Sequence, residues 1–165
     1  MRSETIVGVV AGVVVALASQ VISYLFDRLK KWQEERRREK AVLTLLRHEV
    51  ENHQHGYEMH IPLAQQCIDE KGPEHTGYRY AKAKTDVYDK VFLVYWHLLP
   101  DEVVKSAISY YSAVHVYNSA SGEMGAPSDV PVKDTKKIIE RAQNGAGALM
   151  RLLEKYVPSP KPATC

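Results

Sequence analysis

The chain has 165 residues, with 22 Lys and Arg against 20 Asp and Glu, so its formal net charge is +2. This length accommodates one folded domain with an appendage, and the small charge excludes a strongly basic nucleic-acid-binding protein. A mean hydropathy of −0.32 excludes a protein with many membrane spans, although it is compatible with one. The two cysteines, Cys67 and Cys165, are too few for a disulfide scaffold and form no zinc-binding pattern.

An apolar stretch near the N-terminus predicts a single membrane span. Residues 6–26 carry no charged side chain and consist mostly of Val, Ala, Gly, Leu and Ile. A helix needs about 20 such residues to cross a hydrocarbon core about 30 Å thick. The alternative is a cleaved signal peptide that ends at the Ala-Leu-Ala sequence at 16–18. Because apolar character continues well beyond that sequence, we expect residues 1–26 to form an N-terminal transmembrane anchor.

The distribution of cations around this stretch predicts its orientation. Residues 27–40 contain seven Lys and Arg, whereas Arg2 alone precedes the span. The positive-inside rule then places the N-terminus outside and the rest of the chain in the cytoplasm, as in a single-pass protein of the cell (inner) membrane. We expect 27–40 to be a basic juxtamembrane helix. Its cations set the topology, and they also suit contact with anionic lipid headgroups. The residues for such contact are Arg28, Lys30, Lys31, Arg36, Arg37 and Arg38.

Small residues recur along one face of the predicted span. Successive small residues are three or four positions apart, which places them on one helix face; they are Gly8, Gly12, Ala16, Ser19 and Ser23. In lipid, helices associate where small residues let their backbones approach closely. This face therefore predicts pairing with another span, either in a second copy of the chain or in a protein partner.

Helical periodicity dominates the rest of the sequence, which predicts an all-α fold. We expect the first helix of the soluble part to continue directly from the span. Pro62 should end it or open a short helix that stops at Gly72. A further helix should begin after Thr85, with the stripe Val87, Val91, Val94 and Leu98. Another should begin after Pro100, with the stripe Val104, Ala107/Ile108, Tyr111, Val114 and Asn118. The clearest apolar seam, at 138–156, predicts the last helix. We therefore expect a cytoplasmic bundle of about four helices at 41–157, followed by a Pro-rich flexible tail at 158–165.

Two short patterns resemble a loose group of bacterial single-span membrane proteins. The first comprises Leu46, Glu49, Val50 and Asn52, soon after the span and basic linker. The second is Leu99-Pro100 with Glu102, ahead of the pair Tyr110-Tyr111. In that group a comparable helix follows the span, and a later Leu-Pro helix carries paired tyrosines. The resemblance implies a bacterial inner-membrane setting and implies no activity.

A cluster of His and Glu at 48–60 is the one metal-binding candidate in the sequence. The candidate ligands are Glu49, His53, His55 and His60. Imidazole and carboxylate groups one helical turn apart suit zinc or iron. However, neither the HExxH pattern nor the paired ExxH pattern of di-iron bundles occurs. The alternative interpretation, which we favour, is a polar helix face with His53 at the edge of the core, hydrogen-bonded to a neighbour.

The sequence contains no recognisable catalytic motif, P-loop or dinucleotide fingerprint. We therefore expect no cofactor, no resident metal and no catalytic residue. The pattern favours a membrane-anchored helical interaction or adaptor protein that recruits or regulates a partner at the cytoplasmic face. The alternative is a metal-dependent enzyme or metal-binding protein that uses the segment 48–60.

Overall fold

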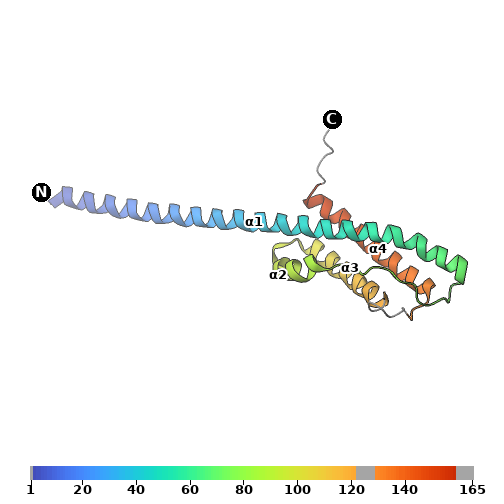
Figure 1. The fold of residues 1–165 in the computed structure, drawn as a ribbon. Helices are drawn as coiled ribbons and strands as arrows, with labels where there is room; N and C mark the ends of the chain where they lie inside the picture. Colours follow the sequence, from blue (N-terminus) through green and yellow to red (C-terminus); the bar gives the residue numbers. More distant parts are fainter. Residues whose placement is uncertain (1, 122–128, 159–165) are drawn as a thin grey trace, which may run out of the picture. The chain divides into compact units, whose positions relative to one another are not determined.

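The computed structural model describes residues 2–121 and 129–158, with side chains described from Ser19 onward (Figure 1). Within these ranges all regular structure is helical, and no strand occurs. This confirms the predicted all-α class. The helices are α1 (Arg2–Lys71), α2 (Leu93–Tyr95), α3 (Asp101–Ala120) and α4 (Val132–Tyr156), with a π-helical turn at Tyr88–Phe92 and a 3-10 turn at Trp96–Leu98.

The chain divides into two compact units, Met1–Arg38 and Glu39–Cys165. The second unit contains the last part of α1 together with α2, α3 and α4. Of the helices in the described ranges, none is both long enough and apolar enough to cross a membrane. Most of the predicted span, with Gly8, Gly12 and Ala16 of its small-residue face, lies outside the described side chains. The predicted tail likewise falls outside the described residues, except for its first residue.

The expectation that α1 breaks at Pro62 was wrong. The helix continues through this proline to Lys71, although proline removes one backbone hydrogen bond and crowds the preceding turn. Packing outweighs this cost, because Tyr57 and Ala64 on either side of the proline are fully buried. The helix ends where predicted. Gly72 follows with a φ of 90°, a left-handed conformation that glycine adopts without strain.

One continuous core joins the last part of α1 to α3 and α4. The seam predicted for the last helix is confirmed, with Ile139, Ala142, Ala146, Leu149 and Leu153 all fully buried. In the segment before α3 the π-helical turn inserts an extra residue and rotates the buried face. As a result Phe92 enters the core, whereas Val94, expected on the buried stripe, is 56% exposed.

Truncation of Leu149 tests the central position of α4. Leu149→Ala should lower the free energy of unfolding by about 2–5 kcal/mol, because a fully buried leucine leaves a cavity. Leu63→Ala is the matched control, since Leu63 lies on α1 with half of its surface exposed; it should change stability by less than about 0.5 kcal/mol. Urea unfolding of the full chain in detergent, followed by circular dichroism, measures both. Equal losses would contradict the assignment of α4 to the core.

Candidate functional site

The segment between α1 and the π-helical turn, residues 72–87, is here called the connector. It has no regular structure over most of its length, and polar side chains of α1 and α3 hold it in place. From α3, the Tyr117 hydroxyl donates to the Ala81 carbonyl at 2.8 Å. The Asn118 side-chain amide accepts from the Ala83 N–H and donates to the Ala83 carbonyl, at 2.8 and 2.9 Å. The two helices thus fix the connector through hydrogen bonds to its backbone.

Glu49 of α1 is buried and accepts three hydrogen bonds at the end of the connector. Its carboxylate oxygens receive the N–H groups of Val87 at 2.7 Å and Tyr88 at 3.2 Å, and the Tyr111 hydroxyl at 2.5 Å. The two N–H groups belong to the first turn of the helical segment that follows Thr85, where a negative charge is stabilised. Burial and the Glu49 carboxylate both raise the pKa of Tyr111, which therefore stays protonated and donates. Glu49 acts here as a remote N-cap.

His53 lies one turn further along α1 and is also buried. Its Nε2 is 2.6 Å from the Lys84 carbonyl, which only accepts, so Nε2 carries the proton and donates. Its Nδ1 then accepts from the Tyr110 hydroxyl at 2.7 Å, and the Tyr57 hydroxyl lies 3.3 Å from that of Tyr110. Burial lowers the pKa of His53, and the Lys84 carbonyl and the Glu49 carboxylate offset part of this shift. The ring is therefore held neutral.

Tyrosine hydroxyls complete this polar layer. Burial raises the pKa of Tyr57 to about 12 and that of Tyr110 still further, so both remain protonated at physiological pH. At the far end of the layer, the Nδ1 atom of His60 is buried and has no hydrogen-bond partner within the described chain. Burial lowers the pKa of His60 as well. The other polar groups of the layer, on Glu49, His53, Tyr57, Tyr110 and Tyr111, are hydrogen-bonded within the protein, as buried polar groups usually are.

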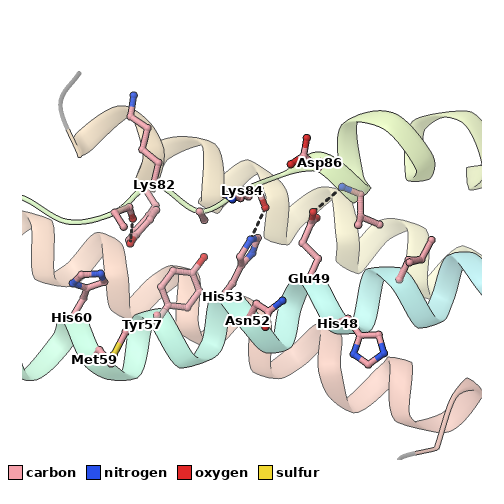
Figure 2. A pocket seen from close by; sticks show the side chains of 16 residues that line it. His48, Glu49, Asn52, His53, Tyr57, Met59, His60, Lys82, Lys84 and Asp86 are labelled. Carbon is pink, nitrogen blue, oxygen red and sulfur yellow. Dashed lines mark hydrogen bonds between the residues drawn. The ribbon is translucent and has the colours of Figure 1, made fainter. Parts of the chain in front are cut away.

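A groove of about 460 Å³ runs between α1 and the connector (Figure 2). Figure 2 shows His53 and Glu49 projecting from α1 toward the connector, which carries Lys82, Lys84 and Asp86. The groove falls within the size range of ligand-binding pockets. Its lining includes apolar side chains, a helical glycine and charged groups, of which the most informative are Leu45, Gly56, Met59, Lys82, Lys84 and Asp86.

The structure does not bring the four candidate metal ligands together at one point. Glu49 and His53 face the connector, and protein donors and acceptors already occupy their polar atoms. His55 is exposed, and His60 lies at the far end of the groove. In the described part of the chain, no three His, Cys, Asp or Glu side chains are grouped as a metal site would require. His53 instead has the position that the alternative interpretation predicts, at the edge of the core and bonded to a neighbour.

Sequence reasoning missed the partners that make this site. The main omissions are Tyr80, Lys84 and Asn118. Lys84 takes part through its backbone carbonyl, which carries no residue-specific signal. Asn118 lay on the predicted apolar stripe of α3, and an amide side chain in such a stripe does signal a buried hydrogen-bond partner. Comparisons with protein-family models, curated proteins and solved structures give no match to this chain. The resemblance to bacterial single-span proteins therefore stays a prediction.

Loss of the Tyr111 hydroxyl tests the Glu49 cap. Tyr111→Phe should lower the free energy of unfolding by about 1.5–3 kcal/mol, the usual range for a hydrogen bond to a charged group. Tyr156→Phe is the matched control, because the Tyr156 hydroxyl also donates to a carboxylate, that of Glu102, but on the surface. The control should leave the urea midpoint unchanged. If both variants behave alike, the Tyr111–Glu49 bond does not hold the fold together.

The neutral state of His53 predicts how stability depends on pH. Because burial depresses its pKa in the folded state, the stabilisation is complete above the ordinary imidazole value of 6.5 and is lost as pH falls below it. His60 contributes in the same direction. His53→Gln, which can still donate to the Lys84 carbonyl, should therefore show a shallower loss of stability between pH 7.5 and about 5 than the parent chain. His55→Gln, on the exposed face of α1, should retain the parent slope. Urea midpoints across this range measure the effect, and parallel curves for parent and His53→Gln would contradict it.

Proposed function

We propose that this chain is a membrane-anchored helical interaction protein that recruits or regulates a partner at the cytoplasmic face of the cell (inner) membrane. The observation that carries the proposal is a run of exposed apolar side chains on α1. Each is more than half exposed: Val21, Ile22, Tyr24, Leu25, Phe26, Leu29 and Trp32. An exposed apolar surface of this extent is typical of contact with a membrane or a partner. Its first five members, up to Phe26, belong to the uncharged stretch at residues 6–26.

The charges at the C-terminal end of this surface and beyond it support an interfacial position. The Arg36 guanidinium lies 5.6 Å from the ring centre of Trp32, and the Arg28 guanidinium donates to the Tyr24 hydroxyl at 3.3 Å. Aromatic rings gather at the headgroup level of membranes, and long cationic side chains extend from there to lipid phosphates. The proposed lipid contacts are Arg28, Lys30, Lys31, Arg36, Arg37 and Arg38. The same cations favour the orientation with the bundle inside the cell.

The partner-binding part of the proposal concerns the bundle itself. Its polar layer is engaged in holding the connector, which favours a structural role for Glu49 and His53 over a catalytic one. The groove beside that layer remains open. We also propose that the small-residue face of the span, from Gly8 to Ser23, pairs with a second copy or with a partner's span.

Two linked measurements test this function. A reporter that is active only in the cytoplasm, fused after Cys165, should be active in cells, and the chain should fractionate with membranes. A protein that co-purifies with the full chain in mild detergent should also sediment with membranes, and it should become soluble when residues 2–38 are deleted. The proposal fails if the chain is soluble, if only a periplasmic reporter is active, or if no associated protein changes its fraction upon the deletion.

A further inference from the structure

We propose that the groove between α1 and the connector binds a short, extended peptide segment that alternates apolar and acidic side chains. This inference rests on the proposed function, since it names the kind of partner segment that the bundle would hold. Three features of the groove, all judged among the described residues, support it: one connector residue whose backbone is not hydrogen-bonded, a glycine in the helical wall, and two lysines without an ion pair at the rim.

The first feature is the backbone of Lys82. The connector directs the carbonyls of Ala81 and Ala83 toward α3, whereas the carbonyl of Lys84 points to His53 on α1. In an extended chain, successive residues direct their N–H and C=O groups to opposite sides. The backbone groups of Lys82 therefore lie on the same side as those of Lys84, facing α1 across the groove.

Neither the N–H nor the C=O of Lys82 has a hydrogen-bond partner in the part of the chain that the structure describes. The connector backbone on either side of it, at Ala81, Ala83 and Lys84, is bonded to a side chain of α1 or α3. The free N–H and C=O of Lys82 can pair with the C=O and N–H of an extended peptide that lies alongside the connector. This pairing would give affinity without regard to the peptide's side chains.

The second feature is Gly56, which lines the groove from the middle of α1. Glycine weakens a helix interior relative to alanine, so a glycine there calls for a physical reason. Among the described residues, a Cβ atom added to Gly56 would meet nothing within 4 Å, so their packing does not require a glycine here. Its missing side chain leaves the helix surface open for close approach of another backbone. The groove is therefore shaped for a thin, extended occupant.

The third feature is the balance of charge and apolar surface at the rim. Asp86 is ion-paired with Lys90 at 2.7 Å, whereas Lys82 and Lys84 have no ion-pair partner among the described residues. Leu45 and Met59, which are 45% and 51% exposed, provide apolar contacts along α1. An occupant with apolar side chains toward α1 and carboxylates toward the lysines complements both surfaces.

The test uses the full chain, labelled with nitrogen-15 in detergent micelles, and two blocked six-residue peptides. One alternates leucine and aspartate, and the other alternates leucine and lysine. The aspartate peptide should shift the amide signals of Gly56 and Lys82 and bind at least tenfold more tightly than the lysine peptide. A double variant, Lys82→Gln with Lys84→Gln, should remove that preference.

Two glycine variants provide the matched comparison. Gly56→Ala places a methyl group in the groove and should weaken binding of the aspartate peptide at least tenfold. Gly147→Ala makes the same change inside α4, where the added Cβ meets only ordinary contacts at 3.9 and 4.0 Å, and should leave affinity unchanged. Both should raise the unfolding midpoint, because alanine favours the helix. Weakened binding by Gly56→Ala therefore cannot be attributed to a damaged fold.

Four outcomes would overturn the inference. They are no amide shift in the groove at millimolar peptide, equal affinity for the two peptides, unchanged binding by Gly56→Ala, or shifts that map to another surface. These failures are distinguishable from failure of the proposed function. Suppose that the partner leaves the membrane fraction when residues 2–38 are deleted but stays bound to the Gly56→Ala variant. The adaptor role would then hold, and the groove would have no part in it.

Discussion

The arrangement of the bundle depends on the hydrogen bonds that the buried carboxylate of Glu49 accepts. A carboxylate in a protein interior is costly unless charged or polar donors surround it. Glu49 obtains its donors from two different elements, the helical turn where the connector ends and Tyr111 of α3. Because all three donors must reach one side chain of α1, they fix the relative positions of α1, the connector's end and α3. Apolar packing fills the core, and the three hydrogen bonds to Glu49 add a directional constraint on the alignment of these elements.

The sequence predicted those parts of the fold that depend on local periodicity. The seam of α4 could be derived because its apolar residues recur every three or four positions, and the structure buries Leu149 and its neighbours as expected. Local rules failed where tertiary packing prevailed, as at Pro62, where burial of Tyr57 and Ala64 keeps α1 intact. They also failed at the π-helical turn, because a single inserted residue rotates every later side chain and no residue type marks the insertion.

The candidate site was only partly predictable for a related reason. The concentration of His and Glu at 48–60 did identify the segment of α1 that carries the polar layer. Its partners, however, lie 31 to 62 residues away in sequence, and one of them is a backbone carbonyl. A sequence shows which side chains could bond a metal or a neighbour, but the choice between these depends on which groups the fold brings within reach. Here backbone N–H groups and tyrosine hydroxyls reached Glu49 and His53.

The connector is attached in a way that lets part of it open without unfolding of the bundle. From Ala81 to Asp86 no side chain is fully buried, so this stretch is held by a small set of polar bonds rather than by apolar area. A segment of that kind opens locally at a free energy well below that of global unfolding. Its backbone amides should therefore exchange with solvent hydrogen through an opening that denaturant scarcely affects, while those of α4 should exchange only when the whole bundle unfolds. Residues 81–86 are thus the part of the connector that opens most easily, and the rates of their opening and closing would set how fast a ligand enters or leaves the groove.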